Sequence, residues 1–83
     1  MPKADDFLES FSRRLDVEPP DSATVELLLA VAGVAAHSSE RTAAPIAAFL
    51  VGRAGLAPAD ALVHAEAVAA ELAGTSASDE EGR

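Results

Sequence analysis

Apolar residues recur along the chain at the three- and four-residue spacing of α-helices, and short polar or proline-containing segments interrupt the pattern three times. The pattern predicts a first helix from about residue 4 to residue 15 and a second from Asp21 or Ser22 to about residue 37. Pro45 and Pro58 suit the first turns of a third and a fourth helix, because the N–H groups of those positions have no partner within the helix anyway. The sequence therefore predicts an all-α fold with four helices.

The first predicted helix is amphipathic. Its large apolar residues fall on one face: Phe7, Leu8, Phe11 and Leu15. Asp5 and Asp6 lie at its N-terminal end, and Arg13 and Arg14 at its C-terminal end, where the helix dipole favours these charges. The Pro19-Pro20 pair forbids a continuation of the helix. We therefore expect a break between the first two helices.

The second and third predicted helices are apolar on almost every side. In the second, one stripe comprises Val25, Leu28, Leu29, Ala32 and Ala36, and other sides carry Leu27, Val31 and Val34. The third, which we expect to reach Arg53, carries Ile46, Phe49, Leu50 and Val51. A helix without a polar face is normally buried on all sides. Because the flanking helices of so short a chain cover only part of that perimeter, we expect apolar surface to remain exposed.

This surplus of apolar surface predicts an interface with a protein partner or with a second copy of the chain. The candidate interface residues are Leu27, Val31, Val34, Ile46, Phe49 and Leu50. In the alternative, packing within the chain hides both central helices. The sequence leaves both possibilities open.

The fourth predicted helix has a narrower apolar stripe. Leu62, Ala65, Ala69 and Leu72 recur at a spacing of three and four residues, and Gly74 suits the position just after a helix. Residues 75–83 are polar and acidic, a composition typical of disorder. We therefore expect one compact, bundle-like domain over residues 4–74, followed by a disordered acidic tail over residues 75–83.

Charge and composition exclude several classes of function. Lys+Arg 6 against Asp+Glu 14 gives the 83-residue chain a formal net charge of -8, which repels nucleic acid and anionic membranes. The longest apolar run, residues 27–36, is far shorter than the ~20 residues that span a bilayer. The N-terminus lacks the pattern of a secretory signal, and the absence of cysteine excludes disulfides and thiol chemistry. We therefore expect a cytoplasmic protein without a nucleic-acid or membrane partner.

The polar segment between the second and third helices holds the best candidates for specific chemistry. Arg41 and Thr42 precede the third helix, whose first N–H groups attract anions. His37 lies near the end of the second helix. The three residues His37, Arg41 and Thr42 predict a site for a small anionic molecule such as a nucleotide. The alternatives are a histidine that caps the second helix and an arginine that pairs with Glu40 or with an acid of the first helix.

The chain carries little catalytic or metal-binding equipment. His64 follows Asp60 by four residues, a spacing typical of a solvated pair on a helix. No histidine pair, carboxylate–histidine motif, glycine-rich phosphate loop or calcium loop occurs in the sequence. We therefore expect no enzymatic activity, no metal and no cofactor.

The central segment resembles a known family. His37-x-x-x-Arg41-x-x-Ala44-Pro45, followed by Phe49-Leu50-x-Gly52, is similar to a small uncharacterised helical domain of high-GC bacteria. In that family the domain is found beside, or fused to, the molybdenum-cofactor guanylyltransferase that makes molybdopterin guanine dinucleotide. The likeness extends from Phe7 to about Leu72. It implies a noncatalytic accessory or protein-interaction module with the guanylyltransferase as a partner, and it supplies no reaction.

A second resemblance concerns the start of the second helix. Asp21-Ser22-Ala23 looks like the motif of acyl carrier proteins in which a serine carries phosphopantetheine, which implies modification of Ser22. Ala23 stands where carriers have leucine, and the connection over residues 16–21 is shorter than the loop that carriers need. A helix-capping role for Asp21 or Ser22 explains the same residues.

Overall fold

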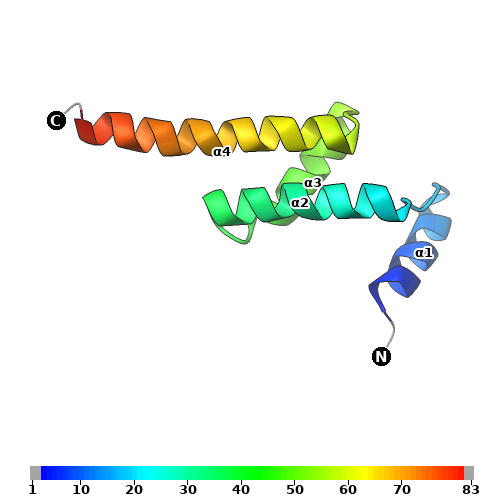
Figure 1. Ribbon diagram of the computed structural model, residues 1–83. Helices are drawn as coiled ribbons and strands as arrows, with labels where there is room; N and C mark the ends of the chain where they lie inside the picture. Colours follow the sequence, from blue (N-terminus) through cyan, green and yellow to red (C-terminus); the bar gives the residue numbers. More distant parts are fainter. Residues whose placement is uncertain (1–2, 82–83) are drawn as a thin grey trace.

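The computed structural model describes the backbone of residues 3–81 and the side chains of residues 3–74. Within these residues the chain forms four α-helices and no strand. In order they are α1 (Ala4–Leu15), α2 (Ser22–Ser38), α3 (Ala43–Ala54) and α4 (Pro58–Glu81) (Figure 1). The predicted all-α fold with four helices is confirmed. None of the four helices is both long and apolar enough to cross a membrane.

Helix α2 is the centre of the arrangement. It packs against both α3 and α4. Figure 1 shows α2 and α4 side by side and running in the same direction, with α3 carrying the chain back between them. The three helices therefore form one packed unit, and α2 has neighbours on two sides.

The hydrophobic core of this unit is small. Its fully buried apolar side chains among the described residues are Val31 of α2 and Ala61 of α4, which are 2% and 4% exposed. Along α4 the predicted inner stripe is confirmed for Leu62, Ala65 and Ala69, which are half-buried. Leu72 is exposed. Helix α4 continues past the end of α2 (Figure 1).

One sequence-based expectation for α2, the exposure of Val31, is wrong. Val31, a candidate interface residue, is buried in the core, whereas Leu29, on the stripe with Leu28, is 66% exposed. Two positions along a helix differ by about 200° around its axis, so Val31 and Leu29 point to nearly opposite sides. The side that α3 and α4 contact is the Val31 side, and it includes the half-buried Leu27, Leu28 and Val34.

Helix α1 is turned away from the other three helices (Figure 1). Asp16 ends it in the left-handed conformation with φ 61, and the exposed segment over residues 17–21 leads to α2. The apolar face of α1 is exposed at Phe7, Phe11 and Leu15. The rings of Phe7 and Phe11 contact each other, with centroids 5.5 Å apart.

The molecule is therefore less compact than the bundle we expected. Its radius of gyration is 15.6 Å, against about 12 Å for a compact domain of this length. Its principal extents are 54 × 28 × 18 Å. Two features account for the difference: α1 packs little against the remaining helices, and α4 is longer than expected.

The C-terminal end of α4 also differs from the prediction. Gly74 does not end the helix, which continues to Glu81. Among the described glycines only Gly55 has a positive φ, so Gly74 keeps helical geometry rather than the left-handed geometry of a helix stop. The predicted disordered acidic tail over residues 75–83 lies outside the residues whose side chains the structure describes, and it stays a prediction.

Candidate functional site

Helix α3 turns its small residues inward and its large residues outward. The half-buried side that faces α2 consists of Ala43, Ala44, Ala47, Ala48 and Val51. On the opposite side Ile46, Phe49 and Leu50 are 60%, 61% and 56% exposed. Small side chains allow helix axes to approach closely, so the alanine side fits against α2 and the bulky side is left to solvent. We call Ile46, Phe49 and Leu50 the α3 surface.

Local signals explain why α3 forms where it does. Pro45 lies in its first turn, where a missing N–H costs no hydrogen bond. Gly55 ends the helix with φ 69, and its N–H donates to the carbonyl of Gly52 at 3.1 Å. A positive φ is easily adopted by glycine. These signals fix the length of α3, while packing against α2 fixes which side faces out.

A groove lies between α3 and α4. It has a volume of about 300 Å³, with Val31 of α2 among the residues that line it. The other lining residues are Ala47, Leu50, Val51, Ala54, Leu56, Ala61, His64, Ala65 and Val68. Of these ten side chains only that of His64 is polar, so the groove suits an apolar occupant.

A second hollow of about 500 Å³ lies around the turn between α2 and α3. It is lined by Ser39, Glu40, Thr42, Ala43, Ile46, Ala47 and Leu50. Ala47 and Leu50 line both hollows, so the two hollows adjoin along the side of α3. We call the two adjoining hollows together the α3 groove.

Two basic residues lie near the two ends of α3 in the sequence. Residues 41–55 contain Arg41 and Arg53 and no acidic residue, although the whole chain has a net charge of -8. The guanidinium of Arg53 lies over the ring of Phe49, 6.0 Å from its centroid. This distance is within the range of a cation–π contact. The segment is thus a locally basic and apolar part of an acidic molecule.

The predicted interface residues divide into two groups. The exposure expected for Ile46, Phe49 and Leu50 is confirmed. Leu27 and Val34 are half-buried, and Val31 lies at the core, where it lines the groove. Contact of any of these residues with a partner stays a prediction.

The predicted anion site is not assembled in the structure. His37, Arg41 and Thr42 are exposed, and none of the side-chain hydrogen bonds found within residues 3–74 involves His37 or Arg41. Thr42 precedes α3 without a capping bond from its side chain. Of the charged residues in this segment, Glu40 lines the adjacent hollow and Arg41 does not. A carboxylate in that position disfavours an anion.

Two serines, rather than His37, form hydrogen bonds with backbone carbonyls at the C-terminal end of α2. The hydroxyls of Ser38 and Ser39 donate to the carbonyls of Val34 and Ala35, each at 2.6 Å. Both carbonyls lie four residues earlier in the chain, near the C-terminal end of α2. The sequence could have predicted these two bonds, because serine commonly donates to the carbonyl four residues earlier in a helix.

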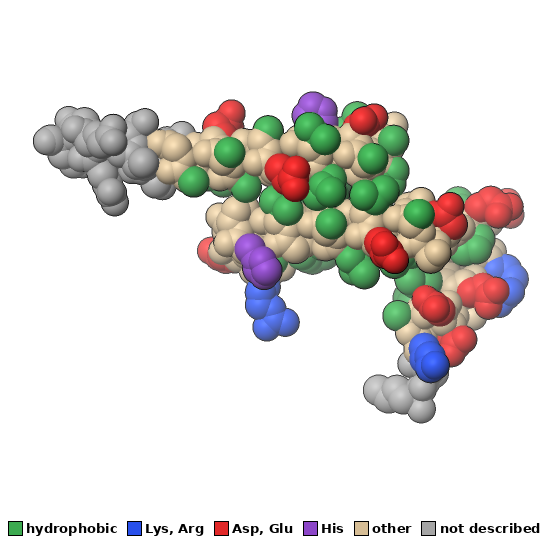
Figure 2. Space-filling view, viewed as in Figure 1, with side chains coloured by type: hydrophobic (Ala, Val, Ile, Leu, Met, Phe, Trp, Pro, Cys, Tyr) green, Lys and Arg blue, Asp and Glu red, His purple; other side chains and the backbone are tan. Residues whose placement is uncertain are grey.

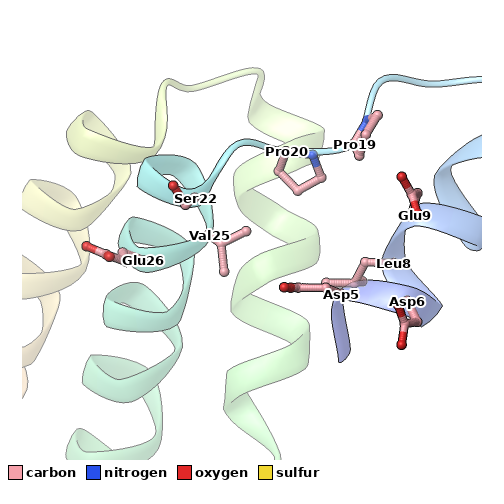
Figure 3. Close-up of a pocket in the computed structure, with 9 residues that line it drawn as sticks. All are labelled: Asp5, Asp6, Leu8, Glu9, Pro19, Pro20, Ser22, Val25 and Glu26. Atoms are coloured by element: carbon pink, nitrogen blue, oxygen red, sulfur yellow. The ribbon is translucent and has the colours of Figure 1, made fainter. Parts of the chain in front are cut away.

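An acidic hollow between α1 and α2 was missed by the sequence analysis. It measures about 480 Å³ and is lined by Asp5, Asp6, Leu8, Glu9, Pro19, Pro20, Ser22, Val25 and Glu26. Figure 3 shows Asp5 and Leu8 projecting from α1 toward α2. No group of three or more His, Cys, Asp or Glu residues in the described part of the chain is placed to hold a metal ion.

The start of α2 shows why Asp21 and Ser22 stand where they do. The carboxylate of Asp21 accepts a hydrogen bond from the N–H of Thr24 at 2.8 Å, as a helix cap does. This backbone hydrogen bond lowers the pKa of Asp21 below its ordinary 3.8. The predicted capping role is thus confirmed for Asp21. Modification of Ser22, which is exposed at the acidic hollow, stays a prediction.

The comparisons with known proteins give a family and no activity. No curated protein matches the chain, and no solved structure matches it. One family model matches residues 1–81 and carries the description Domain of unknown function (DUF6457). Because this match covers almost the whole sequence, the chain belongs to that family.

Proposed function

We propose that this domain is a noncatalytic interaction module that binds an amphipathic helix of another polypeptide along the α3 groove. The observation that carries the proposal is the orientation of α3, which places Ile46, Phe49 and Leu50 in solvent and alanines in the packed interior. Large exposed apolar patches mark interaction sites on proteins. A helix laid in an apolar groove is a common mode of recognition of this kind.

The energetics of the α3 surface fit a binding site of moderate affinity. Covering the exposed part of each of its three side chains stabilises a complex by about 1–2 kcal/mol. A micromolar Kd corresponds to about 8 kcal/mol, and association carries its own entropic cost. Contacts with the floor and walls of the α3 groove must therefore add to those of the exposed side chains.

The resemblance of residues 37–52 to the domain beside the molybdenum-cofactor guanylyltransferase suggests the first partner to test. We propose that the module binds this enzyme and accompanies the attachment of the nucleotide. Isothermal titration calorimetry of the two purified proteins measures the interaction directly. Absence of heat at concentrations of tens of micromolar would remove the enzyme as a partner.

Matched variants test the groove itself. Leu50→Ser removes an apolar side chain from the α3 groove, and we expect it to weaken partner binding by about tenfold or more. Leu29→Ser removes an equally exposed leucine from the outer side of α2, and we expect it to leave the affinity unchanged. Equal affinities for both variants and the wild type would rule out the α3 groove as the binding surface.

A further inference from the structure

The molecule exposes more surface than a chain of its size normally does. Its accessible surface is 6596 Å², whereas a compact monomer of 8.4 kDa exposes about 4,600 Å². The excess of about 2,000 Å² is larger than the ~800 Å² that each partner contributes to a standard stable interface. The chain therefore has enough uncovered surface for an extensive contact with a second copy of itself.

Helix α1 has the properties of a ligand for the α3 groove. Its apolar residues Phe7, Phe11 and Leu15 follow one another at four-residue intervals on one face, and all three are exposed. This spacing is the pattern of anchors by which amphipathic helices occupy apolar grooves. The exposed connection over residues 16–21 joins α1 to the packed helices and leaves α1 turned away from them (Figure 1).

The N-terminal end of α1 and the residues of α3 carry charges of opposite sign. Helix α1 begins with Asp5 and Asp6 in its first turn. Residues 41–55, which contain α3, carry Arg41 and Arg53 and no acidic residue, although Glu40 precedes them and lines one hollow of the α3 groove. Elsewhere acidic side chains are distributed over α1, α2 and α4 (Figure 2). The positive charge of residues 41–55 is therefore opposite in sign to that of the N-terminal end of α1.

From the surface area, the free amphipathic helix and the complementary charges, we propose that α1 of one copy occupies the α3 groove of a second copy. The exchange is reciprocal, so that each chain supplies one helix and one groove and the contact closes into a dimer with twofold symmetry. A short proline-containing connection such as residues 16–21 is a suitable hinge for such an exchange. This inference uses the groove of the proposed function and identifies α1 as an occupant of it.

Size-exclusion chromatography with light scattering tests the dimer on the full chain. At about 100 µM we expect twice the monomer mass of 8.4 kDa for the wild type. Phe11→Ser damages the helix and Leu50→Ser damages the groove, so each variant alone should elute as a monomer. Leu29→Ser, outside both elements, should remain a dimer. Circular dichroism checks that each variant keeps its helices, since all three positions are exposed.

Mixing the two damaged variants distinguishes exchange from other contacts. Phe11→Ser retains an intact groove and Leu50→Ser retains an intact α1, so a 1:1 mixture should recover a heterodimer held by one of the two contacts. If the dimer were held by contacts between the two α1 helices, Leu50→Ser would remain a dimer. If it were held by contacts between the two grooves, Phe11→Ser would remain a dimer. Either result would overturn the inference. A wild-type monomer at this concentration, with α1 free or closed on its own groove, would also overturn it.

Cross-linking provides a readout that does not depend on weakened binding. The natural chain contains no cysteine, so Phe11→Cys and Leu50→Cys chains can be mixed and joined with a short bismaleimide. We expect a covalent product of dimer mass from the mixture. Absence of this product, together with a monomeric wild type, contradicts the exchange.

The same variants test the proposed function independently of the dimer. Phe11→Ser leaves the α3 groove intact and should still bind the guanylyltransferase, whereas Leu50→Ser should lose both the dimer and the partner. A monomeric wild type that binds the enzyme would remove the exchange and keep the proposed function. A reciprocal dimer that binds no enzyme would keep the exchange and remove the enzyme as partner.

Discussion

At the scale of single residues, short-range hydrogen bonds set the ends of α2. Asp21 accepts from the N–H of Thr24 at the N-terminal end, and Ser38 and Ser39 donate to backbone carbonyls at the C-terminal end. The Asp21 bond satisfies an N–H that the helix itself leaves unpaired, whereas the two serine bonds are the local bonds that serine makes to a carbonyl four residues earlier. Because these bonds are local, they do not depend on how α2 packs against α3 and α4.

The Asp21 cap predicts a pH-dependent stability. Its pKa in the folded protein is below the ordinary 3.8 because the N–H of Thr24 stabilises the carboxylate. The stabilisation is therefore complete at a pH above the ordinary value and is lost as the pH falls through the lower folded value. Asp21→Asn keeps a capping acceptor without the charge. Thermal unfolding should show wild type losing stability relative to Asp21→Asn below about pH 4, and parallel pH profiles would contradict this account.

Two glycines predict opposite responses to the same substitution. Gly55 has φ 69, a conformation that costs an alanine about 1 kcal/mol, so Gly55→Ala should destabilise the protein by that amount. Gly33 lies within α2, and a methyl group added to it meets no atom within 4 Å. Gly33→Ala should stabilise the protein by about 1 kcal/mol. Chemical denaturation measures both, and equal signs would refute the assignment.

At the scale of elements, the bounds of the helices were readable from the sequence and their orientation was not. Prolines, the Asp21 cap and the three- and four-residue spacing place the starts of all four helices and the ends of the first three close to where they are observed, whereas α4 runs past Gly74 to Glu81. Helices α2 and α3 have almost no polar face, so periodicity does not specify which side turns inward. Packing against α3 and α4 decides the orientation of α2, and this is why the burial of Val31 was not predicted.

The same reasoning explains what could be predicted of the candidate site. Exposure of Ile46, Phe49 and Leu50 follows from a shortage of chain to cover them, a property of composition and length. The α3 groove depends on distances between α3 and α4 that no local pattern contains. The acidic hollow joins Asp5 of α1 to Glu26 of α2, and only the turn over residues 16–21 brings those residues together.

The two sides of α2 predict different costs for the same truncation. Val31 is 2% exposed, so Val31→Ala removes buried methyl groups and leaves a cavity, at a cost of about 2 kcal/mol. Leu29→Ala removes more atoms from a side chain that faces solvent and should cost less than about 0.5 kcal/mol. Urea denaturation of both variants at low protein concentration measures the difference. A larger effect at Leu29 would mean that α2 is rotated from the orientation described.

At the scale of the whole molecule, apolar surface and net charge act against each other. The accessible surface of 6596 Å² includes many large apolar side chains, which favour association. The net charge of -8 opposes it, because two copies repel each other at long range. Which effect dominates is set by the ionic strength, since salt screens charge and does not weaken apolar contact.

Self-association should therefore strengthen with sodium chloride. The Debye length falls from about 30 Å at 0.01 M to about 3 Å at 1 M, which removes most of the repulsion between two chains of charge -8. Analytical ultracentrifugation across this range should show a several-fold decrease in the dimer Kd. Circular dichroism at each salt concentration separates this effect from stabilisation of the fold. A Kd that rises with salt would instead mean that ion pairs of Arg41 and Arg53 with the acids of α1 dominate the contact, because only such pairs are weakened by screening.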